Sequence, residues 1–512
     1  DLVATLKTER LAKEQLQHRL SLMLRHRFGR RSETIDPNQM ELFLAQIQAA
    51  LAQAPEPPAE AEKPAPKRKG HGRRKPSSTL PRVRTEYPLP KDQQVCACCG
   101  KTLVKIDEEV TTQVNYVPSS IFVQEHVRFT YACADGCEGS VVTSEMPVQP
   151  IEKGLPGAGL LAHVAVSKYA DHLPLYRQEA ILARQGLAVK RSTLCDWVKR
   201  TTEIVKPIYH AMTADLLGST VLHTDDTPVP VLDLAWAAGA AVAAKACADS
   251  DVAADTGPGG RRTRQGRLWV YVGDSAHPHD VFEYTPTRRR EGPRDFLEGW
   301  KGKLQADAYT GYDGLFATGD ILEVGCWAHG RRYFKDAQGV DPPRAQAALA
   351  FIHRLYAVER AAKDQTADER RALRQQHARP VLDAFRAWLD AQAPTILPKS
   401  PMGVAMGYAL RQWTALTRYL QDGNLDIDNN AAERALRCVA IGRKNWMFAG
   451  SDTGGDRAAI LYSLVSSCKR HGLDPFVYLR DVIQRVSTTP ASRIRELLPA
   501  YWKPATATDP RD

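Results

Sequence analysis

The stretch VLHTDDTPVPVLDL at residues 221–234 predicts a β-strand that carries two adjacent acids, Asp225 and Asp226. Further strand-like runs follow at 267–287, 302–309 and 321–329, with helical segments between the later ones. Strands that alternate with helices predict an α/β layer. Because side chains alternate between the two faces of a strand, only one of the two acids can face a given site.

Two more acids stand where such a layer could form a site. Asp307 comes at the end of the run GKLQADAY, beside the turn that Tyr309 and Gly311 begin, and sites of α/β proteins collect at strand ends. Glu433 lies in NNAAERALR, where Asn430 could cap a helix and Glu433 would complete a capping box. Each acid, taken alone, reads more readily as a turn or capping residue.

A helical block separates these two acids in the sequence. Apolar stripes at helical spacing are formed by Leu349, Ile352 and Tyr356 and by Leu382, Phe385 and Leu389. We therefore predict a helical insertion at 341–420, after which the site-bearing fold resumes. The site would then be assembled from segments that lie far apart in the chain.

The composition indicates a partner and a compartment. Lys and Arg number 69 against 59 Asp and Glu, a net charge of +10, and this surplus favours a polyanion, with nucleic acid the leading candidate. The longest clearly apolar stretch, at 234–244, is too short to span a bilayer, and the N-terminus lacks the apolar core of a secretory signal. We expect a cytoplasmic protein with no membrane partner.

Closely spaced cysteines in the first third of the chain indicate a metal site. In the cytosol the ten cysteines should stay reduced, so paired spacings suggest zinc rather than disulfides. Two knuckles joined by strand-like sequence predict a zinc ribbon with the ligands Cys96, Cys99, Cys133 and Cys137. Cys98 competes for a ligand position, and the alternative is a set of buried thiols without metal.

Three further segments flank this module. Leucines at roughly heptad spacing in residues 1–53 predict a helix, which either forms a coiled-coil dimer or packs within the chain. Residues 54–90 are rich in proline and contain KRKGHGRRK, which predicts an extended linker whose charges are solvated or contact phosphates. Residues 489–512 are an uninformative tail.

Residues 160–200 predict three helices at helix-turn-helix spacing, with a turn at 185–187 and Ser192 or Thr193 capping the last helix. That helix would present four residues of types that contact phosphates and base edges: Arg191, Ser192, Thr193 and Lys199. The alternative is a plain helical bundle that connects two domains.

Eight motifs in order make the chain resemble the transposases of the insertion sequence 66 family, bacterial enzymes of the DDE type. The motifs are FGRRSE (28–33), the cysteine module (96–137), KYADHLPLYRQE (168–179), HTDDTPVPVLD (223–233), QADAYTGY (305–312), GCWAHGRRYF (325–334), DNNAAERALR (428–437) and GRKNWMFAGSDTGG (442–455). The resemblance spans nearly the whole chain.

The resemblance implies a ribonuclease H-like α/β catalytic domain in which Asp225, Asp307 and Glu433 are the catalytic acids. Asp226 matches a second acidic position beside the first catalytic acid, and its role stays open. Cys326 and His329 match a C-x-x-H signature, which we expect to shape the sheet rather than catalyse. The predicted fold is a multidomain α+β protein.

The predicted domains follow from these segments. They are the N-terminal helix or leucine zipper (1–53), the linker (54–90), the zinc ribbon (91–150), the helix-turn-helix region (151–212), the first part of the catalytic domain (213–340), the helical insertion (341–420), the completion of the catalytic domain (421–488) and the tail (489–512).

Three clustered carboxylates would repel one another unless cations neutralise them, and oxygen ligands select Mg²⁺ or Mn²⁺. Two such ions can drive hydrolysis of a phosphodiester and then strand transfer at one site. We expect double-stranded DNA (terminal repeats and target) as partner and a homo-oligomer, with accessory proteins of the same element as candidate further partners. Residues expected to hold DNA are Arg288, Arg289, Arg290, Arg443 and Lys444, with Trp446 stacking on an unpaired base.

Two readings from other classes remain. A zinc-dependent DNA-binding regulator without catalysis would use the acids only as caps and turns. A nuclease of the same fold would cut DNA and never join it.

Overall fold

The computed structural model describes residues 154–232 and 263–504, shorter runs between 121 and 152, and Ala12, Lys13 and Leu16. The chain divides into two compact units, residues 61–126 and the remainder, and the description below concerns the larger unit. Most of the predicted N-terminal helix, the linker and the four proposed zinc ligands lie outside the described residues. No helix among the described residues is long and apolar enough to cross a membrane.

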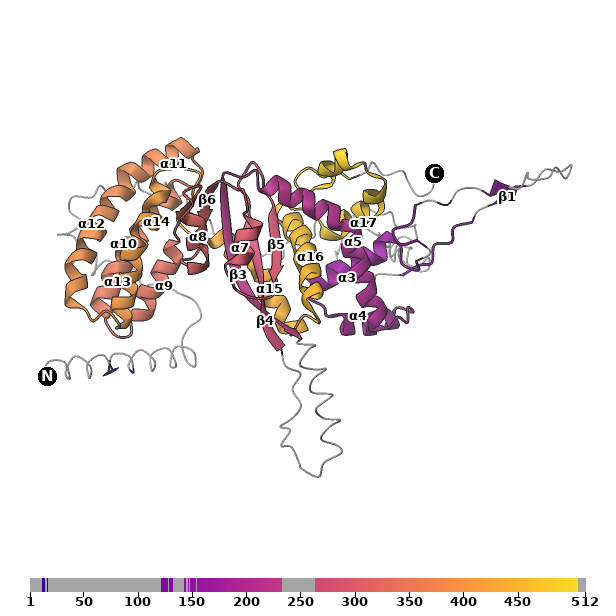
Figure 1. Cartoon of the computed structure of the whole chain (residues 1–512), viewed down its shortest axis with the longest axis horizontal. Helices are drawn as coiled ribbons and strands as arrows, with labels where there is room; N and C mark the ends of the chain where they lie inside the picture. The colour runs from indigo at the N-terminus through magenta and orange to yellow at the C-terminus, as the bar shows by residue number, and fades with distance from the viewer. Residues whose placement is uncertain are drawn as a thin grey trace, which may run out of the picture. The chain divides into compact units, whose positions relative to one another are not determined.

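A five-stranded sheet stands at the centre of the larger unit (Figure 1). Its strands are β3 (Val221–Leu232), β4 (Thr263–Val272), β5 (Asp280–Thr285), β6 (Gly302–Gln305) and β7 (Ile321–Val324). In space their order is β5-β4-β3-β6-β7. The pairs β5/β4 and β4/β3 are antiparallel, whereas β3/β6 and β6/β7 are parallel. The longest strand, with the two adjacent acids, therefore lies in the middle.

Between residue 154 and the sheet the structure has three helices: α3 (Ala158–Tyr169), α4 (Leu175–Arg184) and α5 (Arg191–Leu216). The turn between α4 and α5 contains Gly186 at φ 91°, a conformation that glycine adopts without steric cost. The predicted cap at Ser192 or Thr193 is wrong, because α5 begins at Arg191 and its N-cap is Lys190, without a capping side chain. The two hydroxyl residues lie inside the first turn.

The segments between the later strands are short: α7 (Glu291–Phe296), the 3₁₀ turn Thr310–Tyr312 and α8 (Asp313–Phe316). After β7 comes a helical block with its own core. Its helices are α9 (Trp327–Ala337), α10 (Pro342–Ala361), α11 (Ala367–Leu373), a π-helical turn (Arg374–Ala378), α12 (Arg379–Gln392), α13 (Pro401–Arg411) and α14 (Trp413–Thr417). Five of the six residues of the predicted stripes are buried in this core, and Tyr356 packs against it.

Three helices then return to the sheet: α15 (Asn430–Trp446), α16 (Asp452–Arg470) and α17 (Pro475–Arg485). They share a second, larger core with the sheet and with α3 and α5. In Figure 1, α15 and α16 lie beside β3, β4 and β5, whereas the helical block lies on the side of β6 and β7. A short 3₁₀ helix, Ala491–Leu497, follows.

The outer edge of β5 is closed by side chains rather than by another strand. Ser467 and Ser463 of α16 accept hydrogen bonds from the backbone N–H groups of Asp280 and Phe282 at 3.0 and 2.7 Å, and the Tyr209 hydroxyl donates to the Phe282 carbonyl. Unpaired strand edges are otherwise templates for pairing with another chain. The serines of α16 therefore explain how this edge is satisfied within one chain.

Candidate functional site

The strand register brings Asp225 and Asp307 to equivalent positions. His223 of β3 is paired with Gln305 of β6 in the parallel pair, and each acid lies two residues further along its own strand direction. Parallel strands end at the same edge of a sheet, so the two acids are neighbours there. The charge of Asp307 accordingly raises the pKa of Asp225.

Glu433 reaches the same place from helix α15, where it lies in the first turn. The capping box predicted with Asn430 is wrong: Asn430 is already inside the helix, the N-cap is Asn429, and no side chain caps the helix. The Glu433 carboxylate is therefore not engaged with the backbone of its own helix end. Its Oε1 lies 3.8 Å from both His329 Nε2 and Arg332 Nη2.

Asn429 fastens the start of α15 to the sheet. Its side-chain amide donates to the Thr224 carbonyl at 2.7 Å, and its Oδ1 lies 3.2 Å from His223 Nδ1. Its backbone N–H donates to Cys326 Sγ at 3.2 Å. A fully buried side chain thus joins three segments that carry or adjoin the acids. Sequence reasoning missed this residue because DNN reads equally well as a turn.

Asp225 and Asp226 occupy different environments although they are neighbours. His223 faces α15, so the alternation of β3 places Asp225 on the side of Glu433 and Asp226 on the opposite face, beside its strand partner Trp269. The Asp226 carboxylate is only 3% exposed and is held by Arg267 and Arg288, each at 2.8 Å. Burial raises the pKa of Asp226, and the charges of Arg288 and Arg267 oppose that shift.

Asp225 has no such compensation among the described residues. Its Oδ1 accepts one hydrogen bond, from the Asp226 N–H at 2.8 Å. Burial raises its pKa to about 7, and the charges of Asp307, Asp226 and Glu433 act in the same direction. An added cation beside this carboxyl group would relieve the repulsion from the three neighbouring acids.

The donor set fits hard divalent cations, because all three groups supply carboxylate oxygens. Among the residues that the structure describes, no three His, Cys, Asp or Glu side chains already surround one point as a metal cage. Besides burial, the charges of Asp307 and Glu433 both act on Asp225 and raise its pKa. Asp307 and Glu433 are both partly exposed, with side-chain exposures of 25% and 31%.

The C-x-x-H pair lies beside the acids. Cys326 is buried and accepts the Asn429 N–H, which agrees with a part in shaping the sheet end. His329 is largely buried, its Nδ1 has no hydrogen-bond partner among the described residues, and burial lowers its pKa. Its position 3.8 Å from Glu433 makes it part of the site's wall.

The residues expected to hold DNA have varied surroundings. Arg289, Arg290 and Lys444 are exposed, as are Arg191 and Ser192, whereas Thr193 and Lys199 are partly buried. Arg443 donates to Thr227 Oγ1 and to the Pro228 carbonyl, both at 2.8 Å. It therefore supports β3 at these two residues. Trp446 packs against the larger core. Arg288 is engaged with the acids, and Arg443 with β3.

Other side chains that position the site were also missed from the sequence. Gln305 donates to the Asp426 carbonyl at 2.7 Å, and Tyr356 of α10 donates to Asp428 at 2.8 Å. Asp428 in turn accepts from the Asn430 side chain. These bonds hold the loop before α15 from both sides. The motif DNNAAERALR signalled the region but not the partners, which come from distant segments.

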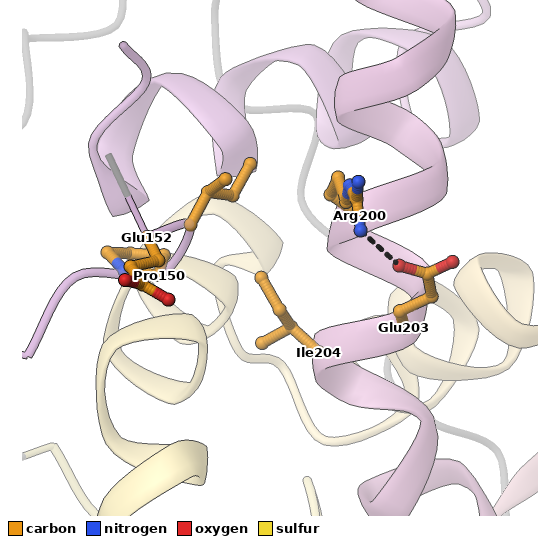
Figure 2. A pocket seen from close by; sticks show the side chains of 6 residues that line it. Pro150, Glu152, Arg200, Glu203 and Ile204 are labelled. Carbon is orange, nitrogen blue, oxygen red and sulfur yellow. Dashed lines mark hydrogen bonds and ion pairs between the residues drawn. The ribbon is translucent and has the colours of Figure 1, made fainter. Parts of the chain in front are cut away.

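A separate cavity of about 330 Å³ opens beside α5 (Figure 2). It is lined by Pro150, Ile151, Glu152, Arg200, Glu203 and Ile204. Figure 2 shows Arg200 and Glu203 paired at its wall, with 3.4 Å between Nη1 and Oε2. The cavity contains none of the three acids, so it is distinct from the site above.

The fold and the site define an α+β protein with a cluster of carboxylates at the centre of a mixed sheet. The family model described as "Transposase IS66 family" matches residues 153–457. Further models match as "IS66 C-terminal element" (463–500), "zinc-finger binding domain of transposase IS66" (93–138) and "Transposase C of IS166 homeodomain" (15–85). The chain belongs to the IS66 family of transposases.

Three proteins of Sinorhizobium fredii (strain NBRC 101917 / NGR234), all described as uncharacterized, are similar over most of their length. Protein y4hP is 32% identical over 80% of this chain and 74% of its own. Protein y4jD is 30% identical over 93% and 92%, and y4qI is 30% identical over 98% and 92%. Membership of this DDE-type family implies catalytic activity, DNA binding and DNA transposition.

Proposed function

We propose that this protein cuts DNA at the ends of an insertion sequence and joins the released 3′-hydroxyl to target DNA. Asp225, Asp307 and Glu433 are the proposed catalytic acids. The observation that carries the proposal is the uncompensated Asp225, whose pKa is raised to about 7 by burial and by the neighbouring acids. A buried acid without a cation partner of its own is costly and is kept where function requires it.

The strand arrangement supports a ribonuclease H-like domain as the scaffold. Three antiparallel strands are followed by two parallel ones in the order β5-β4-β3-β6-β7. The acids come from the central strand, from the end of its parallel neighbour and from a helix packed against both β3 and β4. This arrangement gathers residues from distant parts of the chain at one edge.

Asp225, Asp307 and Glu433 would hold two Mg²⁺ or Mn²⁺ ions, which when bound activate the attacking oxygen and stabilise the leaving one. The chain's own contribution is positioning. Asp225 is fixed by the central strand, and Asp307 by the turn in which its Oδ1 accepts the Tyr309 N–H at 3.2 Å. Glu433 is fixed by the Asn429 attachment of α15.

The remaining predicted residues would bind the substrate. Arg289, Lys444 and the exposed residues of α5 would contact the phosphate backbone of double-stranded DNA. Cys96, Cys99, Cys133 and Cys137 would hold a structural zinc ion, and the module would help to select the terminal repeats. We further propose that the protein acts in the cytoplasm as a homo-oligomer that brings two ends together.

The test is a joining assay with labelled terminal-repeat DNA, a target plasmid and Mg²⁺. The proposal expects joined product from the wild type and none from Asp225→Asn, Asp307→Asn or Glu433→Gln. Asp320→Asn is the matched control, since Asp320 is an exposed acid paired only with Lys301 in the described chain. Cut but unjoined DNA would indicate a nuclease instead, and a bound complex with no product would indicate a regulator.

A further inference from the structure

The guanidinium of Arg288 lies close to two acids, Asp226 and Asp307. Its Nε and Nη2 donate to Asp226 Oδ1 at 3.0 and 2.8 Å, and Nη2 lies 3.8 Å from Asp307 Oδ2. The guanidinium stacks over the Tyr309 ring, 4.2 Å from its centroid. The side chain is 39% exposed, so one cation is shared between two acids at the rim of the site.

Arg267 offers a direct comparison. It also binds Asp226, through Nη1 to Oδ2 at 2.8 Å, and is 22% exposed. It has no ion pair with Asp307 among the described residues. The two arginines therefore contribute equally close contacts to the buried Asp226, and only Arg288 reaches an acid of the proposed metal site.

Electrostatics sets the consequence for cation binding. A positive charge within about 4 to 6 Å of a carboxylate stabilises its ionised form, but it repels a divalent cation that approaches the same oxygens. Before ions bind, Arg288 lowers the repulsion around Asp307. When divalent ions bind at Asp307, the same positive charge repels them. Ion binding is therefore weaker unless the guanidinium moves away from Asp307.

We propose that Arg288 is a built-in counter-cation of the acidic site, which screens Asp307 in the metal-free protein and competes with the divalent ions for it. This inference rests on the proposed function, because it takes Asp307 to be a metal ligand. It replaces the simpler expectation that Arg288 only contacts phosphate. The guanidinium released from Asp307 would become available to the DNA backbone.

The experiment measures Mn²⁺ binding to the metal-free protein, without DNA, by electron paramagnetic resonance of free Mn²⁺. Arg288→Gln is expected to bind Mn²⁺ about tenfold more tightly than the wild type, the size of effect that about 1.4 kcal/mol of removed repulsion produces. Arg267→Gln removes a similar partner of Asp226 and should change the affinity far less. Arg288→Lys keeps the charge and should stay near the wild type.

The outcomes separate this inference from the proposed function. Asp307→Asn supplies the blank, because Mn²⁺ can also bind elsewhere in the chain. If the proteins that retain Asp307 bind Mn²⁺ no more tightly than their Asp307→Asn counterparts, with or without the arginine substitutions, Asp307 is not a metal ligand. Both the proposed function and the role of Arg288 then fail. If Asp307-dependent binding exists but Arg288→Gln leaves it unchanged or weakens it, only the role of Arg288 is overturned. Equal tightening in Arg267→Gln would also overturn it, since the effect would then act through Asp226.

Discussion

At the scale of single residues, the site depends on what surrounds each acid. Asp225 and Asp226 are adjacent and chemically identical, yet Asp226 has two arginine partners and Asp225 has none among the described residues. The same chemical group is an arginine-bound anchor at Asp226 and, in our proposal, a catalytic acid at Asp225. The two acids therefore differ in whether fixed cations lie beside them. The motif HTDD does not encode this difference.

The raised pKa of Asp225 predicts a pH-dependent stability in the absence of divalent ions. Its folded pKa of about 7 exceeds the unfolded value of 3.8, so its favourable contribution is complete below pH 4 and is lost as the pH rises through about 7. Asp225→Asn should remove this dependence and stabilise the protein at pH 8, by at most about 4 kcal/mol. Urea unfolding at pH 5 and pH 8 in a chelator measures it.

The control for this measurement is Asp320→Asn, which should leave the slope of stability against pH unchanged. A variant Asp225→Asn that loses stability equally at both pH values would show that the carboxyl group is compensated in a way that the structure does not reveal.

Asn429 gives a second prediction at this scale. Asn429→Ala leaves the Thr224 carbonyl and His223 without their partner, which should cost about 1 to 3 kcal/mol. Joining activity should fall by at least tenfold, because α15 then holds Glu433 less accurately. Kinetics of cleavage at saturating DNA would show the loss mainly in kcat. Asn424→Ala, at an exposed loop position, should have little effect on either quantity.

At the scale of elements, the helical block supports the loop that precedes α15. Arg374 in the π-helical turn is fully buried and uses all its donors. Two go to Glu359, at 2.8 and 2.7 Å. The others go to the carbonyls of Tyr419, Asp422 and Leu425. The insertion is thereby tied to the chain a few residues before Asp428 and Asn429, which explains how a distant block helps to position the helix that carries Glu433.

Arg374→Met should therefore be strongly destabilising. It leaves the largely buried Glu359 with only the more distant Arg370, at 3.8 Å, and removes one donor from each of three carbonyl groups, a change that costs about 3 to 5 kcal/mol. Equilibrium urea unfolding gives the value. Arg371→Met is the matched control, since Arg371 is 57% exposed on the neighbouring turn and pairs only loosely with Asp368. A loss below 1 kcal/mol for Arg374→Met would contradict the supporting role of this residue.

At the scale of the whole molecule, the family models divide the chain into a zinc-finger segment, a long transposase segment and a C-terminal element. Within the described residues, two apolar cores meet at the sheet, one shared with α15 and α16 and one inside the helical block. The acids lie near the points where the chain enters and leaves the helical block. Cys326 precedes the block and Asn429 follows it, and the two residues are joined by a hydrogen bond.

The zinc-finger segment gives a prediction that needs no knowledge of its structure. The purified protein should contain about one zinc ion per chain, held by four thiolates. Replacing Cys96 or Cys137 with serine should remove that zinc, as measured by elemental analysis, and should weaken binding to terminal-repeat DNA. Cys195→Ser, at an exposed cysteine of α5, should keep the zinc content of the wild type. Zinc retained in both ligand variants would contradict the assignment.

The sequence by itself determined the order and type of the main elements and the family. The strands at 221–234 and 267–287 and the stripes of the helical block are local patterns, set by side-chain periodicity along the chain. The candidate acids were visible in the same way, because strand ends and motif positions are local features.

Only the tertiary structure decided which candidate residues are held by ion pairs and which are not. The two arginines on Asp226, the contact of Arg443 with β3 and the attachment of Asn429 to Thr224 all join residues far apart in the chain. Charge compensation and burial depend on such contacts, and no local period encodes them. The predicted cap at Asn430 failed for the same reason, since the contacts of Asn429 with the sheet fix where α15 begins. The predicted cap at Ser192 or Thr193 also failed, because α5 already begins at Arg191.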